Sequence, residues 1–503
     1  MSDAPEPIGQ ALGRLARENP DLPAITMAGS SVTRDQLERR SNRLARAFGA
    51  AGVGAEDLVT IALPNSVEFL EAAVACWKLG AVPQPVSARL PGRELATIVE
   101  LADSALVVGV DADLVPGRVT WAAGREPDAG LSDEPLPPAA AGSWKAPTSG
   151  GSTGRPKLIL SGDPAMVPDG PGLNMRRDGC MVIPGPLYHN APFTSSSLGL
   201  FYGNHVVLLP RFDAEATLRS IEEHRPDLML VVPTMMIRIL RLDDQVRARY
   251  DVSSLRTVWH MGAPCPVWAK RAWIDWLGGE KIWELYAGTE MQAVTVIRGD
   301  DWLQHVGSVG RVIGGEMKIV DPETGQDLPA GEVGEIFLRV SPGGKSTYRY
   351  LGAEAQTIGD GWESLGDMGS FDEEGYLYLA DRRADMILSG GANIYPAEVE
   401  AALNEHRGVE SCAVIGLPDE DLGQVVHAIC RVSPGTAPPS DEELAAFVAE
   451  RLVRYKVPRS FEWVGEPVRD DAGKVRRSAL RSERVRSRDG QAQARRGVEQ
   501  ETQ

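Results

Sequence analysis

The sequence predicts an α/β protein: a large N-terminal domain of layered parallel and mixed sheets with helices and a small β-subdomain, then a smaller, mobile α+β domain. Three observations predict this class. The 503 residues exceed what one hydrophobic core usually serves. In the first part of the chain, short apolar strands alternate with amphipathic helices, as in parallel sheets. From about residue 307 to 379 the pattern changes to short strands separated by glycine turns.

The N-terminal elements are predicted from helix caps and apolar spacing. Thr33, with Gln36 three positions later, forms a capping box for a helix that runs to about Ala51. Further helices are expected over residues 67–79, 213–224, 235–240 and 267–277, and strands over residues 58–63, 106–110, 206–209, 228–232, 257–260 and 281–285. The Ala-, Pro- and Gly-rich residues 111–143 are expected to form a surface excursion.

The C-terminal part begins after a charged run, residues 381–385, which lies between two apolar stretches. A helix is expected over residues 396–403, strands over 412–415 and 425–432, and a second capped helix from Ser440. We therefore expect an N-terminal domain over residues 1–381, a hinge at 382–385 and a lid domain over 386–480. The polar residues 481–503 are expected to be disordered.

The composition excludes several classes of partner. Apolar residues make up 43% of the chain and charged residues 24%, as in globular proteins. The formal net charge of -18 argues against a nucleic-acid or anionic-membrane surface, and no apolar run is long enough to span a membrane. The five cysteines show neither metal-ligand spacing nor a disulfide framework, which predicts a cytoplasmic setting.

The clearest chemistry lies in residues 148–157. Hydroxyl residues and glycines are mixed there, and a lysine closes the run: Thr148, Ser149, Gly150, Gly151, Ser152, Thr153, Gly154 and Lys157. Glycines let backbone N–H groups converge on one point, and hydroxyls add donors, so the loop suits a polyphosphate. The common nucleotide P-loop ends in Gly-Lys-Ser/Thr before a helix, whereas here an apolar strand over residues 158–160 follows the lysine. A mobile surface loop is the alternative.

Together with segments that follow in fixed order, this loop resembles the phosphate loop of the adenylate-forming superfamily, which comprises acyl-CoA synthetases, amino-acid adenylation domains and beetle luciferases. The resemblance extends from about Leu37 to Arg477. It implies an AMP-forming acid–thiol ligase that uses ATP, Mg²⁺ and CoA and acts on a small carboxylic acid. A homodimer is left open.

The resemblance also implies roles for nucleotide-binding residues. The loop holds the β- and γ-phosphates, and the turn Gly262-Ala263-Pro264 contacts adenine. Within Tyr286-Ala287-Gly288-Thr289-Glu290, Tyr286 stacks on adenine, Thr289 contacts the α-phosphate and Glu290 helps to hold Mg²⁺. Asp367 and Arg382 bind the ribose. The segment that contains Gly390 and Gly391 lines the CoA tunnel after the C-terminal domain has rotated.

Two further segments are implied to handle the acid. Lys474 resembles the lysine that orients the carboxylate against the α-phosphate. Residues 186–190 resemble the aromatic and histidine segment that gates the acyl pocket, so His189 is a catalytic as well as a pocket candidate. The candidate pocket residues are His189, Asn190, Thr194, Val232, Met235, Trp259, His260, Gly288 and Met291.

The sequence departs from the family pattern near three of these sites. Val468 and Asp470 flank Arg469 where Pro-Arg-Thr or Pro-Arg-Asn is usual, and Ala384 stands at the hinge. Ala287 replaces a common glycine. Acidic groups at Asp470 and its neighbour are expected to pull on Lys474, so an enzyme that performs mainly thioesterification of supplied acyl-AMP is an alternative.

The spelling of residues 149–154 looks like that of ligases for bulky cyclic acids of the bile-acid, steroid or terpenoid type. No Phe-Asp pair of the kind that binds an amino acid's ammonium group is present in the gating segment. The small and apolar candidate pocket residues suit a large hydrophobic acid. Medium- or long-chain fatty acids and aryl acids remain open. So does a non-catalytic acyl-adenylate-binding protein, because a fold does not fix a function.

Overall fold

The computed structural model describes residues 5–150, 156–390, 392–419, 421–433, 435–470 and 473–487. Its main body is built on a 14-stranded sheet with the path β16-β17-β20-β21-β15-β14-β13-β12-β11-β9-β10-β1-β2, where β2 (Ser30–Thr33) is one edge and β19 pairs with β20 off this path. The parallel strands are β1 (Pro23–Met27), β9 (Cys180–Ile183), β10 (His205–Leu208), β11 (Leu228–Val231), β12 (Thr257–Met261) and β13 (Ile282–Tyr286). The predicted layered parallel sheet is confirmed.

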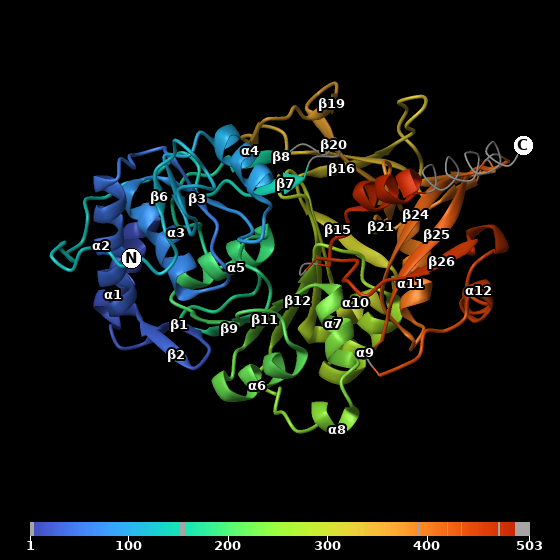
Figure 1. The fold of residues 1–503 in the computed structure, drawn as a ribbon, viewed down its shortest axis with the longest axis horizontal. Coiled ribbons are helices and arrows are strands. Elements are labelled where there is room, and N and C mark those ends of the chain that lie inside the picture. Colours follow the sequence, from blue (N-terminus) through green and yellow to red (C-terminus); the bar gives the residue numbers. More distant parts are fainter. Residues whose placement is uncertain are drawn as a thin grey trace, which may run out of the picture.

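A second, parallel sheet lies beside it. It orders β4 (Val82–Pro85), β3 (Leu58–Ile61), β5 (Leu106–Val108) and β6 (Thr120–Trp121). Figure 1 shows α1 (Ile8–Glu18), α2 (Arg34–Ala50) and α3 (Val67–Leu79) packed at this end of the molecule. Thr33 caps α2 with a complete capping box, as predicted. The strand β6 lies in the stretch that we expected to be only a surface excursion.

Of the remaining helices of the body, α4 packs against β3 and β8, and the others lie along the large sheet (Figure 1). These helices are α4 (Gly92–Ala102), α5 (Asn190–Phe201), α6 (Ala214–His224), α7 (Pro233–Leu240), α8 (Asp244–Arg247), α9 (Val267–Leu277) and α10 (Gly299–Trp302). The predicted helices over 67–79, 213–224, 235–240 and 267–277 are confirmed within a few residues. None of the helices in the described part of the chain is long and apolar enough to cross a membrane.

The small β-subdomain expected after residue 307 is continuous with the large sheet. Antiparallel β14 (Val294–Arg298) and β15 (Ser308–Gly314) join β13 to β21 (Leu377–Arg382). The outer strands are β16 (Glu316–Val320), β17 (Gly334–Arg339), β19 (Gln356–Ile358) and β20 (Trp362–Phe371). The expected pattern of short strands is therefore confirmed, and one unbroken ladder of hydrogen bonds joins this region to the parallel strands.

The chain leaves that sheet at Arg382 and enters a five-stranded sheet at Ile387. Its strands are β22 (Ile387–Ser389), β23 (Ala392–Ile394), β24 (Val409–Asp419), β25 (Gly423–Val432) and β26 (Ser460–Trp463), and it carries α11 (Pro396–Asn404) and α12 (Asp441–Ala449). Residues 477–487 form a helix, so the disorder expected from residue 481 is wrong for 481–487. Arg484 pairs there with Glu462 at 2.8 Å, a tertiary contact that a polar sequence does not reveal. Residues 488–503 lie outside the described residues.

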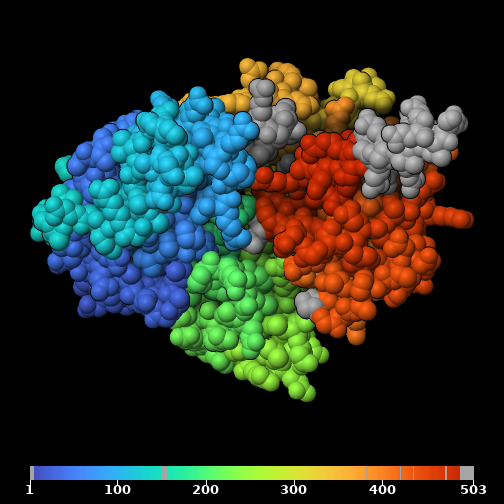
Figure 2. Space-filling view, in the orientation of Figure 1, coloured from blue at the N-terminus to red at the C-terminus, as the bar shows by residue number. Residues whose placement is uncertain are grey.

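This C-terminal part lies against the body, as the orange and red surface in Figure 2 shows. Arg241, at the C-terminal end of α7, donates to the carbonyl oxygens of Glu410 at 2.7 Å and Asn404 at 3.0 Å. An ion pair between Arg476 and Glu94, at 3.6 Å, adds a second contact. These contacts fix one orientation of the C-terminal part on the body.

A buried ion pair lies beneath the middle of the large sheet. Lys270 of α9 donates to Glu284 of β13, and the side chains are 0% and 7% exposed. Burial raises the pKa of Glu284, and Lys270 opposes that shift. His260 is fully buried, with Nε2 3.8 Å from Glu284 Oε2. Removing one charge would therefore leave the other in a medium of low dielectric constant.

We predict that Lys270→Met lowers the free energy of unfolding by about 3–5 kcal/mol, because Glu284 loses its counter-ion. The double variant Lys270→Met/Glu284→Leu should recover most of that loss, because no charge remains buried. Urea unfolding followed by tryptophan fluorescence measures both. Equal destabilisation in the single and double variants would contradict the ion-pair explanation.

Candidate functional site

The predicted phosphate loop joins the strands of an antiparallel hairpin. β7 (Thr148–Gly150) precedes it and β8 (Pro156–Ser161) follows it, and β18 (Tyr348–Leu351) pairs with the other edge of β8. The predicted strand after the lysine is confirmed. Thr148 Oγ1 accepts from Gln84 Nε2 at 3.0 Å, which ties the hairpin to β4. Residues 151–155, with the predicted Gly151, Ser152, Thr153 and Gly154, lie outside the described residues.

Lys157, Glu290 and Tyr350 form a cluster at the base of this hairpin. Lys157 Nζ is 3.2 Å from Glu290 Oε1 and 2.8 Å from the Tyr350 hydroxyl, which itself donates to Glu290. Burial and the Glu290 charge raise the pKa of Tyr350, so the hydroxyl keeps its proton. Tyr350 was not predicted from the sequence. It comes from β18, whose pairing with β8 places it opposite Ile159.

The residues expected around a nucleoside lie on neighbouring strands. The hydroxyl of Tyr286, the last residue of β13, donates to Asp367 Oδ2 at 2.8 Å. Arg382 lies opposite Asp367 in the pairing of β20 with β21. The sheet thus brings together residues that are about eighty to a hundred positions apart in the sequence, as the resemblance implied.

Two glycines near these residues are required by the backbone. Gly262, directly after β12, has φ of 83°, a conformation that favours glycine. A Cβ at Gly288 would lie 2.3 Å from Leu365 Cδ1 and 2.7 Å from Glu290 Oε2. A side chain at position 288 would therefore displace Glu290. Of the residues next to these glycines, Ala263, Ala287 and Thr289 are partly buried and Pro264 is exposed.

The histidine segment is held by Asn65, a residue shortly after β3 whose role the sequence did not reveal. Asn65 donates to the carbonyl oxygens of Gly185 and Leu209, at 3.0 and 2.9 Å, and accepts from the Leu187 amide at 2.8 Å. This side chain is almost fully buried. It fixes the approach of the chain to His189, the residue that precedes the first turn of α5.

The turn that carries Lys474 packs against this segment. Asp470 Oδ2 is 3.8 Å from His189 Nε2. A Cβ at Gly473 would lie 2.8 Å from Thr234 Oγ1 at the start of α7, so the turn approaches the body closely. Lys474 is exposed at this junction. The structure therefore places the predicted catalytic lysine beside the histidine segment, although the two lie far apart in the sequence.

Asp470 organises the turn. Its Oδ1 accepts from the Lys474 amide at 2.9 Å, its own amide donates to the Lys474 carbonyl oxygen at 2.9 Å, and its carbonyl oxygen accepts from the Gly473 amide. We expected this acidic group to disturb the presentation of Lys474. These contacts give Asp470 the role of a turn cap as well, which a carboxylate fills well. The expected pull of Asp470 on the Lys474 ammonium stays a prediction.

Behind the turn, a buried carboxylate links it to the hinge segment. Glu400 pairs with Arg469 at 2.5 Å and with Arg477 at 2.9 Å. Arg469 also donates to the Gly473 carbonyl oxygen at 2.9 Å, and Arg477 reaches Asp385 at 3.0 Å. One ionic network therefore joins the Lys474 turn to the residue that follows Ala384.

The predicted pocket residues are only partly brought together at the surface. Asn190 and Thr194 are partly exposed on one face of α5. Met291 is 44% exposed, with a positive φ of 55°. Val232, Met235 and Trp259 are buried, and the Trp259 indole donates to the Leu173 carbonyl oxygen at 2.7 Å. His260 is 0% exposed beside Glu284, so the structure does not support the expected pocket role for it.

The predicted CoA-lining segment lies elsewhere in this orientation. Gly390 is exposed at the turn between β22 and β23, and its amide donates to the Leu422 carbonyl oxygen at 2.9 Å. Gly391 lies outside the described residues. The side chain of Arg382 is outside the part that the structure describes. Among the residues with described positions, no group of three or more His, Cys, Asp or Glu side chains could hold a metal ion, so Glu290 is the metal-ligand candidate of the cluster.

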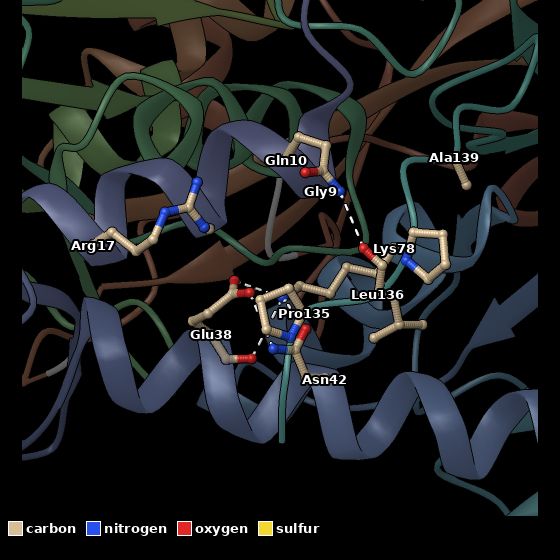
Figure 3. A pocket seen from close by; sticks show the side chains of 11 residues that line it. Gly9, Gln10, Arg17, Glu38, Asn42, Lys78, Pro135, Leu136 and Ala139 are labelled. Atoms are coloured by element: carbon tan, nitrogen blue, oxygen red, sulfur yellow. Dashed lines mark hydrogen bonds and ion pairs between the residues drawn. The ribbon is translucent and has the colours of Figure 1, made fainter. Parts of the chain in front are cut away.

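A small polar cavity lies on other elements, between α1, α2 and residues 135–139 (Figure 3). Lys78 donates there to Glu38 Oε2 and Asn42 Oδ1, both at 2.5 Å. Gln10 donates to the Leu136 carbonyl oxygen at 3.3 Å. The charge of Lys78 is thus balanced within the protein, and we interpret the cavity as a structural feature.

Comparisons with known proteins agree with this geometry. A family model described as AMP-binding enzyme matches residues 12–348, and the AMP-binding enzyme C-terminal domain matches residues 398–474. The chain is 34% identical to a feruloyl-CoA synthase of an Amycolatopsis species over 93% of its own length and 97% of that protein. It is 30% identical to a methyl-dioxo-octahydroindenyl propanoyl:CoA ligase of Rhodococcus jostii, over 96% and 100%.

Among solved structures, the chain is similar to the o-succinylbenzoate CoA synthetase of Bacillus subtilis in complex with its acyl-adenylate intermediate. The TM-score is 0.81 and the identity 26%, and the match covers 95% of this chain and 98% of that one. The predicted arrangement of a large N-terminal and a smaller C-terminal α/β part is thereby confirmed.

The turn contacts predict the effect of replacing Asp470. Asp470→Ala removes one turn-capping bond and the charge that faces His189, which together are worth about 1–2 kcal/mol. We expect ATP-dependent product formation to fall about five- to thirtyfold, while conversion of supplied acyl-AMP is spared. Asp470→Asn keeps the acceptor for the Lys474 amide and should lose less. Equal activity of wild type and both variants in the ATP-dependent assay would contradict the capping role.

Proposed function

The chain belongs to the AMP-binding enzyme family, and on that premise we propose that it is an AMP-forming acid–CoA ligase for a bulky, hydrophobic, cyclic carboxylic acid. The observation that carries the proposal is the seating of the Lys474 turn against His189 and Thr234. We assign Lys474 of that turn to the same site as Lys157, Glu290 and Tyr286, where it would supply a cation from the C-terminal part.

In the first step, an oxygen of the acid attacks the α-phosphorus of ATP, and the bond from that phosphorus to pyrophosphate breaks. Both reactants are anions, so positive groups are needed near the phosphates. We assign the glycine-rich loop and Lys157 to the β- and γ-phosphates, and Thr289 to the α-phosphate. Lys474 orients the carboxylate for in-line attack.

The nucleoside is assigned to the neighbouring strands. Tyr286 offers its ring to adenine, with Gly262-Ala263-Pro264 at the ring edge, and Asp367 accepts from the ribose hydroxyls with Arg382 beside it. The Tyr286 hydroxyl already holds Asp367 at 2.8 Å. This bond orients the carboxylate before the ribose arrives, which reduces the ordering cost of binding.

The residues present fit one magnesium ion. Glu290 is a single buried carboxylate, and Mg²⁺ is usually bound by one or two carboxylates together with substrate phosphates and water. When bound, Mg²⁺ offsets charge on the phosphates and on leaving pyrophosphate. Lys157, at 3.2 Å, and the Tyr350 hydroxyl hold the Glu290 carboxylate in this structure.

In the second step, the thiol of CoA attacks the acyl carbon of acyl-AMP, and AMP leaves. Lys474 has no role in that attack, whereas CoA needs a path to the acyl group. We assign the path to the segment of Gly390 and Gly391, brought in by rotation about residues 382–385. The ionic network through Glu400 supports this assignment, because it joins Asp385 to the Lys474 turn.

The substrate class rests on the pocket and on the relatives. Among the candidate pocket residues, Val232, Met235 and Trp259 are apolar and buried, as suits a hydrophobic acid. The three relatives are named for a feruloyl, an octahydroindenyl propanoyl and an o-succinylbenzoyl group, each of which contains a ring. Medium- or long-chain fatty acids and simple aryl acids are the alternatives.

The proposal predicts that a panel of cyclic, aryl and straight-chain acids, assayed with ATP, Mg²⁺ and CoA, yields acyl-CoA best from bulky cyclic members. Mass spectrometry of acyl-CoA and AMP measures the outcome. Lys474→Ala should lower ATP-dependent acyl-CoA formation by at least about a hundredfold, while acyl-AMP supplied from outside is still converted to acyl-CoA. Preference for long straight chains would support the fatty-acid alternative. No acyl-CoA from any acid or from acyl-AMP would favour a binding protein.

A further inference from the structure

Lys145 is a buried lysine that differs from the other two. Lys78 and Lys270 have carboxylate partners, Glu38 and Glu284. Lys145 is only 5% exposed, yet in the described part of the chain its Nζ bonds only to neutral oxygens, Asn190 Oδ1 at 2.6 Å and Thr194 Oγ1 at 2.5 Å. Burial lowers the pKa of Lys145 to about 7.

This arrangement leaves the lysine incompletely satisfied. An ammonium carries three N–H donors, and two oxygens of the described residues accept from it. The Trp144 ring, with its centroid 4.5 Å from Nζ, offers a weaker cation–π contact. The Asp163 carboxylate offsets part of the effect of burial on Lys145 but accepts no hydrogen bond from its ammonium in the described part of the chain. A buried charge bonded only to neutral groups is costly, and such groups are concentrated at functional sites.

The two partners of Lys145 lie at the edge of the proposed acyl site. Asn190 and Thr194 are four residues apart and share the partly exposed face of α5, whereas Phe193 on the other face is buried. Asn190 directly follows His189, which faces the turn of Lys474. Lys145 therefore lies behind two small polar side chains of the candidate acyl pocket.

The hydrogen bonds also fix which polar atoms face outward. Because a lysine can only donate, Asn190 must turn its oxygen toward Lys145. That oxygen also accepts from the Thr194 hydroxyl at 3.2 Å. Asn190 is consequently left with its amide N–H groups for the open side, so the cluster presents donors and repels an ammonium group.

We propose that Lys145, Asn190 and Thr194 form a specificity-determining donor site for an oxygen substituent, such as a ring ketone, hydroxyl or ether, on the acid. The proposal rests on the function proposed above and narrows it to oxygenated cyclic acids. An acid without that oxygen would enter the pocket but leave the donors unpaired. Such a site discriminates more sharply than an apolar wall does.

Pairs of acids that differ by one oxygen test the proposal. 4-Hydroxycinnamate against cinnamate is one pair, and a ring-ketone hydrindane propanoate against its deoxo analogue is another. For wild type, kcat/KM for acyl-CoA formation should favour the oxygenated member of at least one pair by about tenfold or more. In Lys145→Met, the ratio should fall to within about threefold, through loss with the oxygenated acid, while KM for ATP is unchanged.

Thr194→Val is the matched second variant, because it removes one acceptor of Lys145 and keeps the lysine itself. Thr194 lies on a partly exposed helix face, where the change is tolerated more easily. Thr194→Val should give an intermediate kcat/KM ratio. If circular dichroism shows that Lys145→Met is unfolded, the ratio of Thr194→Val becomes the test of the donor site. An unchanged ratio in folded variants, or wild-type ratios near one for every pair, would overturn the donor site while leaving the ligase intact. No acyl-CoA from any acid would instead overturn the proposed function.

Discussion

An acid and a nucleoside triphosphate are both anions, and bringing them together is the constraint on which this arrangement depends. The chain carries a formal net charge of -18, so its overall field does not help. The cations are local, and buried carboxylates fix them: Glu290 holds Lys157, and Glu400 holds Arg469. Although burial disfavours the Glu400 carboxylate, Arg469 and Arg477 outweigh that effect and hold its pKa below the ordinary value.

The same network explains how a distant segment is delivered to the site. Arg469 holds the carbonyl oxygen of Gly473, and Arg477 reaches Asp385 beside the hinge segment. The Lys474 turn, Glu400 and the start of the C-terminal sheet are therefore coupled in one body. In the orientation described, Thr234 and His189 receive that body, while Gly390 remains exposed on another side of it.

Much of this could be predicted from sequence, because caps and periodic apolar residues are local signals. The capping box at Thr33 and the helix α9 are examples. Contacts between distant segments could not be predicted. Tyr350 reaches Lys157 through strand pairing, and the backbone partners of Asp470 give it a turn-capping role that the sequence did not reveal. His260 faces Glu284 because alternate residues of a strand point to opposite faces of the sheet. Which face of the sheet His260 occupies could be determined only by knowing which face packs on α9.

Isotope exchange between labelled pyrophosphate and ATP tests the central claim most directly, because it requires adenylation and no CoA. The enzyme is incubated with Mg²⁺, ATP, labelled pyrophosphate and an acid that the panel identifies as a substrate. The docked Lys474 turn predicts rapid exchange that depends on the acid and is lost in Lys474→Ala. Absence of exchange from wild type that still converts supplied acyl-AMP to acyl-CoA would contradict it, and would show that the chain performs only the second step.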